Sequence, residues 1–185
     1  AMTKLTRNFI TQTGPFADEY VRRALAAAIG AKVDELALNG AGHSGEPLGL
    51  LNTPGIGAVT GTSLADAGVR EFQTDIGDAL GPSCAFVTDR ATASLLNGRQ
   101  RFTGSDSSLW EGSLHQGRLG GWPAFTASTI PAATLAFGAW EHFAVASWGV
   151  GIELSANPYE SNGFRSGTIE VRALLAFDCA VQSAA

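Results

Sequence analysis

The chain has 185 residues, of which 45% are hydrophobic and 16% charged, and its formal net charge is −5. This length suits one domain or two small interleaved ones, with enough apolar side chains for a core. Lys4 and Lys32 are the only lysines, which argues against a basic surface that wraps nucleic acid, because phosphate binding requires clustered cations. No apolar stretch is long enough to span a bilayer, so we expect no membrane contact.

The first half of the chain is dominated by one long predicted helix, residues 15–38. Pro15 suits a first helical position, and at about 1.5 Å per residue the helix would be about 36 Å long. Asn39-Gly40 is expected to end it with a left-handed cap. A short strand over residues 5–11 is expected to precede it. Two apolar stripes run along nearly opposite sides of the helix: Leu25, Ile29, Val33 and Leu36 on one, and Phe16, Tyr20, Ala24, Ala27, Ala31 and Leu38 on the other.

The middle of the chain predicts a helix, a strand and a second helix. Ser63, with Asp66 three residues later, resembles a capping box that opens a helix, which Gly81-Pro82 would end. Residues 84–88 predict a short buried strand, and Asp89 or Thr88 could cap the next helix, through residue 96. Residues 99–121 are polar and poorly periodic, which predicts a long excursion, either a hairpin or an ordered loop, with a partly buried tryptophan.

The second half is predicted to be mainly strands. Residues 123–128, 134–138, 142–148 and 150–155 are four short candidates. Residues 168–182 form the clearest strand of the chain, because apolar and polar side chains alternate there with a period of two. Its apolar set is Ile169, Val171, Ala173, Leu175, Phe177, Cys179 and Val181.

Several motifs follow one another in an order that is more specific than any one of them. They are VDELALNG at 33–40, the glycines at 42 and 45, Pro47, LGLLN at 48–52, GWP at 121–123, STIP at 128–131, LAFG at 135–138 and the strand of 167–181. Together they resemble the HK97-type major capsid proteins of tailed phages, over nearly the whole chain from about Leu5.

The resemblance implies an α+β fold of the HK97 capsid type. A discontinuous peripheral lobe would hold the spine helix and the long strand, in residues 1–52 and 149–185. An axial lobe, residues 53–148, would hold a mixed sheet flanked by helices. The implied function is that of a structural subunit of an icosahedral phage or prophage capsid. It would be made in the bacterial cytoplasm and associate with itself into pentamers and hexamers of a virion that enclose DNA without sequence-specific binding. An encapsulin-like compartment shell protein is the alternative, and a carbohydrate- or ligand-binding module is a weaker one.

One departure concerns parts that family members usually carry before the spine helix, an N-terminal arm and an extended E-loop. We expect this chain to lack both, and so to be a fragment or a minimal member. In some relatives a lysine of the E-loop forms an isopeptide bond with an asparagine. Because Lys4 and Lys32 do not match that position, we expect no such crosslink.

Chemical motifs give no catalytic, cofactor-binding or metal-binding prediction, so we do not expect an enzyme. GAGHSG at residues 40–45 matches G-x-G-x-x-G, but it follows a helix and opens a loop, whereas a dinucleotide site needs the reverse. The remaining polar candidates have structural interpretations as solvated loop groups or ion pairs. They are His43, His115 and His142; Asp106 and Glu111 with His115; and Asp34 and Glu35 with Arg22, Arg23 or Arg172 as partners.

Cysteines and aromatic residues complete the candidates. Cys84 and Cys179 each sit in an apolar run and are interpreted as buried free thiols rather than a disulfide or a metal site. An exposed aromatic row could hold a sugar or a single strand, but core packing and subunit contacts explain these residues more simply. The set comprises Trp110, Trp122, Trp140, Trp148, Phe125, Phe137 and Phe143.

Overall fold

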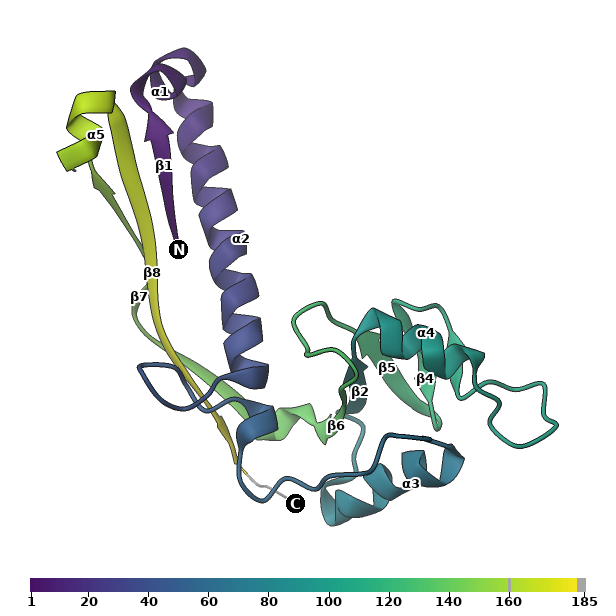
Figure 1. The fold of residues 1–185 in the computed structure, drawn as a ribbon. Coiled ribbons are helices and arrows are strands. Elements are labelled where there is room, and N and C mark those ends of the chain that lie inside the picture. The colour runs from purple at the N-terminus through teal and green to yellow at the C-terminus, as the bar shows by residue number, and fades with distance from the viewer. Residues whose placement is uncertain (160, 183–185) are drawn as a thin grey trace. The chain divides into compact units, whose positions relative to one another are not determined.

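The computed structural model describes residues 1–159 and 161–182 and combines helices with two sheets (Figure 1), which confirms the α+β class. The chain divides into two compact units. The first combines Ala1–Asp34 with Ala146–Asp178, and the second runs from Glu35 to Val145 and resumes at Cys179. Each unit is described below by itself. Within the described residues no helix is both long and apolar enough to cross a membrane.

The first unit places a long helix against a three-stranded sheet of order β1-β8-β7 (Figure 1). Strand β1 pairs antiparallel with β8, with Lys4 opposite Glu170. The elements that lie wholly or partly in this unit are β1 (Met2–Thr6), α1 (Arg7–Thr13), α2 (Pro15–Asn39), β7 (Phe143–Asn157), α5 (Ser161–Ser166) and β8 (Thr168–Val181). The predicted long helix and C-terminal strand are therefore confirmed, with Pro15 as the first helical residue.

Two local predictions for this unit are wrong. The expected strand over residues 5–11 ends at Thr6, because the Thr6 side chain accepts a hydrogen bond from Phe9 N at 3.2 Å and so caps the helix α1. The two strands expected at 142–148 and 150–155 are one strand, β7. Gly149 and Gly151 have φ of 84° and 85° within it, so the glycines distort the strand locally without ending it.

One stripe of α2 and one face of β8 form the core of the first unit. Apolar residues at helical spacing on α2 meet the alternating apolar residues of the strand, which is how a one-sided helix and a one-sided sheet are buried. The cluster consists of Val21, Leu25, Ile29 and Ala173, with Leu5, Val33, Leu154, Val171 and Leu175 against it. The two periodic patterns of the sequence thus predict the faces that pack together.

The second unit contains a five-stranded mixed sheet of order β3-β4-β5-β2-β6 (Figure 1). Strand β2 is parallel to β5 and antiparallel to β6. The elements of this unit are η1 (Leu50–Asn52), α3 (Asp66–Asp75), η2 (Gly77–Ala79), β2 (Cys84–Thr88), α4 (Arg90–Gly98), β3 (Trp110–Gly112), β4 (Gln116–Leu119), β5 (Trp122–Thr126), β6 (Leu135–Ala139) and η3 (Trp140–His142). The predicted strand at 84–88 is confirmed, and so is the Asp89 cap, whose carboxylate accepts from Ala91 N and Thr92 N.

Helices α3 and α4 and the sheet share one core in the second unit. Phe86 of β2 lies at its centre, with Phe137 stacked on it at 4.2 Å and Phe72 edge-on at 6.0 Å. The buried members are Leu64, Val69, Phe86, Ala93, Leu96, Leu109, Trp110, Leu119 and Ala124. Each unit therefore has a hydrophobic core of its own, as a compact unit requires.

The end of α2 differs from the predicted left-handed cap. Gly40 lies outside the left-handed region, and its N–H donates to the Leu36 carbonyl at 2.7 Å. A Cβ on Gly40 would collide with the carbonyl oxygens of Pro47 and Leu36. The glycine is needed because the loop folds back tightly, with Gly49 N donating to Gly40 O at 2.9 Å. Residues 40–45 open a loop and not a helix, as the sequence predicts.

The capping box predicted at Ser63 is wrong. Helix α3 begins at Asp66, its N-cap is Ala65, and no side chain hydrogen-bonds at that cap. The helix ends at Asp75, well before Gly81-Pro82. Asp66 is instead buried and turned toward arginine side chains, so the acidic residue at the helix start has a tertiary partner that the local pattern does not reveal.

Candidate functional site

The excursion of residues 99–121 is an ordered part of the second unit. Backbone hydrogen bonds close its base, from Leu109 N to Arg99 O at 2.9 Å and from Arg101 N to Ser107 O at 2.8 Å. Strands β3 and β4 then form the predicted hairpin. Trp110 is fully buried, not partly buried as predicted, and its indole N–H donates to Ser113 O at 2.9 Å. The tryptophan therefore anchors the hairpin in the core.

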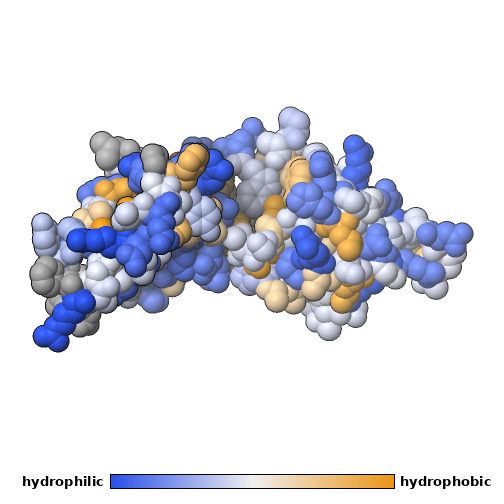
Figure 2. Space-filling view, turned by 90° about the horizontal axis from the view of Figure 1, so that it is seen from above, coloured by the Kyte–Doolittle hydropathy of each residue, from blue (hydrophilic) through white to orange (hydrophobic). Residues whose placement is uncertain are grey.

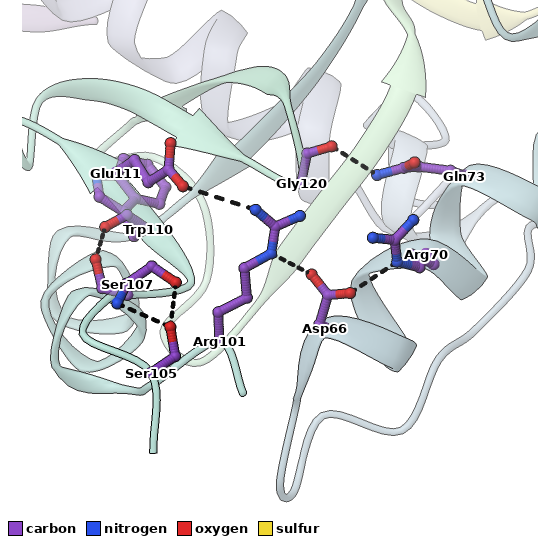
Figure 3. Close-up of polar contacts among 10 residues, drawn as sticks. Asp66, Arg70, Gln73, Arg101, Ser105, Ser107, Trp110, Glu111 and Gly120 are labelled. Atoms are coloured by element: carbon purple, nitrogen blue, oxygen red, sulfur yellow. Dashed lines mark hydrogen bonds and ion pairs between the residues drawn. The ribbon is translucent and has the colours of Figure 1, made fainter. Parts of the chain in front are cut away.

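A buried carboxylate ties this excursion to α3 (Figure 3). The Asp66 side chain is only 8% exposed, and each of its oxygens meets one arginine: Arg70 Nε lies 2.7 Å from Oδ2, and Arg101 Nε lies 2.7 Å from Oδ1. Glu111 is 3.8 Å from Arg101 Nη1. Charge-assisted hydrogen bonds of this length are the strong class. We call Asp66, Arg70, Arg101 and Glu111 the Asp66 cluster.

The arginines control the ionisation of Asp66. The hydrogen bond from Arg70 lowers the pKa of the Asp66 carboxyl most, burial opposes it, and the hydrogen bond and charge of Arg101 add to the lowering, so that the pKa lies below 3.8. The carboxylate stays ionised at neutral pH, with both oxygens occupied by its partners. Such an arrangement holds two chain segments together and leaves no acid or base free for chemistry.

Asp89 has a similar structural role at the start of α4. It caps the helix and also accepts a hydrogen bond from Ala133 N at 3.2 Å. Burial raises its pKa, but hydrogen bonds from Thr92, Ala91 and Ala133 outweigh that effect, so the pKa lies below its ordinary value. This carboxylate therefore joins α4 to the loop before β6.

The polar candidates from the sequence do not converge on a site. Glu111 lies beside Arg101, while Asp106 and His115 are exposed elsewhere in the excursion. His43 contacts Ser44 Oγ at 3.2 Å in the loop after α2, and His142 ends η3. Among residues 1–159 and 161–182, no three His, Cys, Asp or Glu side chains lie together as a metal site would require.

Arg22 and Arg23 are not the partners of Asp34 and Glu35, so this part of the prediction is wrong, while pairing with Arg172 stays a prediction. Arg22 bonds to Asp18 and Arg23 to Glu19, each at 2.8 Å and one turn away. Asp34 is twelve residues beyond Arg22, about 18 Å along the helix axis. The i,i+4 spacing, which brings side chains together on a helix surface, decided the pairing.

Both cysteines are buried free thiols, as predicted. Cys84 Sγ lies 3.6 Å from the Ala79 carbonyl, and Cys179 Sγ lies 3.4 Å from the Leu48 carbonyl. Small buried residues of this kind contribute packing and a weak S–H donor.

Three of the four tryptophans are explained by packing within the second unit. Trp110 is buried, Trp122 packs edge-on to Phe137 at 6.1 Å, and the Trp140 indole donates to Ala85 O at 2.9 Å. Trp148 of β7 is 55% exposed. The structure therefore contains no row of exposed tryptophans over these four positions, which removes the main support for a carbohydrate-binding module.

Apolar residues on the outer surfaces are the remaining candidate for function. On α2, Phe16 is 76% and Tyr20 is 68% exposed, one helical turn apart. Strands β7 and β8 expose Val145, Trp148, Ile152 and Leu174. Figure 2 shows hydrophobic side chains that interrupt the hydrophilic surface in several places. Phe16 and Tyr20, neighbours on one helix, are therefore the best candidate for contact with another protein surface.

Comparison with known proteins identifies the family. A family model described as "Phage capsid family" matches residues 1–185. The chain belongs to the phage capsid family. It is a structural capsid subunit and hence a virion component. The encapsulin alternative gains no support from this match, and a search of curated proteins gives no match.

Solved capsids share the fold of this capsid protein at low sequence identity. The capsid of an empty GTA particle computed with C5 symmetry matches with a TM-score of 0.74 and 18% identity, over 99% of this chain and 68% of that one. The satellite phage P4 procapsid matches with a TM-score of 0.66 and 12% identity, over 99% and 70%. Mycobacterium phage Ogopogo matches with a TM-score of 0.62 and 14% identity, over 100% and 71%. These likenesses show that the fold is of the HK97 capsid type.

Sequence reasoning missed the ion pairs of the Asp66 cluster, although it named Glu111 as a polar candidate and Asp66 as part of a cap. The Asp66-x-x-x-Arg70 spacing was a usable signal, because aspartate and arginine four residues apart on a helix are neighbours. Nothing in the local sequence pointed to Arg101, which lies 35 residues from Asp66.

Proposed function

We propose that this capsid protein, made in the bacterial cytoplasm, associates with itself into pentamers and hexamers of an icosahedral shell that encloses DNA. The first unit would correspond to the peripheral lobe, predicted as residues 1–52 and 149–185, and the second to the axial lobe, predicted as residues 53–148. The protein would act through its interfaces and not as an enzyme, without cofactor or metal.

The observation that carries the proposal is the outward side of α2. One stripe of this helix is buried against β8, while Phe16 and Tyr20 on another stripe remain exposed. Aromatic residues are enriched at the centres of protein interfaces. A long helix with apolar residues on two sides has one side for its own unit and one for a neighbouring subunit.

Charge supports enclosure of DNA without specific binding. The chain has a formal net charge of −5 and 12 lysines and arginines. Arg22, Arg23, Arg70 and Arg101 are engaged in ion pairs with carboxylates. A chain with more carboxylates than cations repels phosphate more than it attracts it, so binding to DNA would be weak and independent of sequence.

The test is the oligomeric state of the double variant Phe16→Asp/Tyr20→Asp. We expect the unchanged chain to form rings of five or six or closed shells, measured by light scattering and negative-stain imaging. The double variant should remain a folded monomer, with an unchanged circular dichroism spectrum.

The double variant Ala26→Asp/Ala28→Asp is the matched control, because both alanines are also exposed on α2 and the two substitutions add the same two negative charges. This variant should assemble normally. If Phe16→Asp/Tyr20→Asp assembles at the same concentration as the unchanged chain, the proposed interface is contradicted. If the unchanged chain stays monomeric at all concentrations, its self-assembly is contradicted.

A further inference from the structure

The second unit contains a cavity of about 170 Å³, all of whose walls come from that unit. It lies among η1, α3, η2, β6 and η3. Neither the ion pairs nor the core cluster described above requires an open space here. The cavity is partly open to solvent, since Ile56 and Asp75 in its lining are exposed, so a ligand can reach it from outside.

The walls are mainly apolar. Leucine, isoleucine and aromatic side chains belong to this lining, among them Leu51, Ile56, Ile76, Phe137, Trp140 and Phe143. An apolar space of about 150 Å³ is large enough to hold one benzene molecule. The size and lining of this one therefore suit a single aromatic ring.

Gly138 of β6 also lines the cavity, and the space beside its Cα is open. A Cβ at this position would meet no atom within 4 Å, and its φ lies outside the left-handed region. Neither a close approach nor backbone geometry requires a glycine at this point of the strand. Any larger side chain would occupy part of the space beside it.

Two residues with polar side chains belong to the otherwise apolar lining: Asp75, which is exposed, and His142, which is partly buried. Asp75 closes one side together with Gly57: a Cβ on Gly57 would lie 3.2 Å from Asp75 Oδ2. An apolar pocket with a few convergent polar groups is the usual form of a small-molecule site, because the apolar walls supply affinity and the polar groups fix orientation.

We propose that this cavity binds a small one-ring aromatic molecule that carries a cationic or neutral hydrogen-bond donor. The ring would fill the space beside Gly138, and the donor would point to the Asp75 carboxylate. An anionic aromatic acid would be disfavoured by the same carboxylate. The site is independent of the proposed oligomeric state, because every wall belongs to one chain.

The test compares three one-ring probes of equal size: benzylamine, benzyl alcohol and benzoate. Binding is measured by equilibrium dialysis, with tryptophan fluorescence as a second readout because Trp140 lines the cavity. We expect saturable binding of benzylamine, and about fivefold weaker binding of benzoate, the ratio expected for a charge pair about 4 Å apart in water. No saturable binding of benzylamine up to tens of millimolar would overturn the proposal.

Two variants place the site. Gly138→Val should abolish binding by filling the cavity, and valine suits a strand. Its control is Gly61→Val, since Gly61 also has open space around a Cβ but does not line the cavity. Unchanged binding by Gly138→Val would overturn the assignment to this cavity.

Asp75→Asn should reduce the preference for benzylamine over benzoate to about one, while Asp78→Asn, an exposed neighbour outside the lining, should leave it unchanged. This second pair keeps the proposal testable if the glycine variant does not fold. A preference that survives Asp75→Asn would overturn the role of the carboxylate.

Discussion

At Gly40 the backbone folds back so tightly that no residue with a side chain fits without a collision. We expect Gly40→Ala to lower the free energy of unfolding by about 2 kcal/mol, because its Cβ would collide with two carbonyl oxygens and overpacking costs about 1–3 kcal/mol. Urea unfolding followed by circular dichroism measures the change.

Gly30 provides the matched control. It lies in the exposed middle of α2, and a Cβ there would meet nothing within 4 Å. Gly30→Ala should therefore raise stability by about 0.5–1 kcal/mol through helix propensity alone. Similar effects of the two substitutions would show that close approach is not what requires glycine at position 40.

Asp66 is a buried residue whose charge is expected to stabilise the fold. Its carboxylate is buried and bonded to Arg70 and Arg101, so Asp66→Asn should cost about 2 kcal/mol at pH 7, the scale of lost charge-assisted hydrogen bonds. The pKa is lowered from 3.8 in the folded state. The stabilisation is therefore complete above the unfolded pKa and is lost as the pH falls through the folded one.

Unfolding measured between pH 7 and pH 2 checks both statements. The difference in stability between the unchanged chain and Asp66→Asn should be constant down to about pH 5 and shrink below about pH 4. Asp78→Asn, at an exposed position, should follow the unchanged chain throughout. A difference independent of pH would mean that the charge of Asp66 does not stabilise the fold.

At the scale of elements, α2 has two apolar stripes with different roles. Leu25 is buried against β8, so Leu25→Ala should lower the free energy of unfolding by about 2–4 kcal/mol. Tyr20 lies on an exposed stripe, so Tyr20→Ala should lower the free energy of unfolding of the dissociated chain by less than about 0.5 kcal/mol. Denaturant unfolding at low protein concentration distinguishes them, and equal losses would contradict a one-sided helix.

At the scale of the whole molecule, two units with separate cores are joined by three long elements, α2, β7 and β8, each of which continues from one unit into the other. Both units lie on the same continuous helix and strands. Assembly that relies on non-covalent contacts between such subunits must bury many of the exposed apolar groups described above.

Assembled particles should hold together without covalent bonds between chains. Lys4 pairs with Glu170 at 3.2 Å in the first unit, and we expect neither it nor Lys32 to act as a crosslinking lysine. A denaturing gel of assembled material should therefore show one band at 19.1 kDa. A ladder at multiples of that mass, resistant to boiling and reductant, would contradict this prediction.

The sequence alone determined the elements whose signal is periodic and local. The apolar stripe of α2, the alternation of β8, the buried strand 84–88 and the Asp89 cap all depend on residues within a few positions of one another, so composition and spacing are sufficient. The order of glycine and proline motifs was likewise enough to predict the capsid family, although each motif alone is weak.

Tertiary structure decided what depends on partners distant in sequence. Asp66 fits a capping box locally, but the arginine 35 residues away comes beside it only when the sheet forms. Contacts with distant segments also explain three other features. They are the collision that requires glycine at Gly40, the complete burial of Trp110 and the continuation of β7 through two glycines. Each is fixed by which segments the topology brings together, and that information is not contained in any short stretch of the chain.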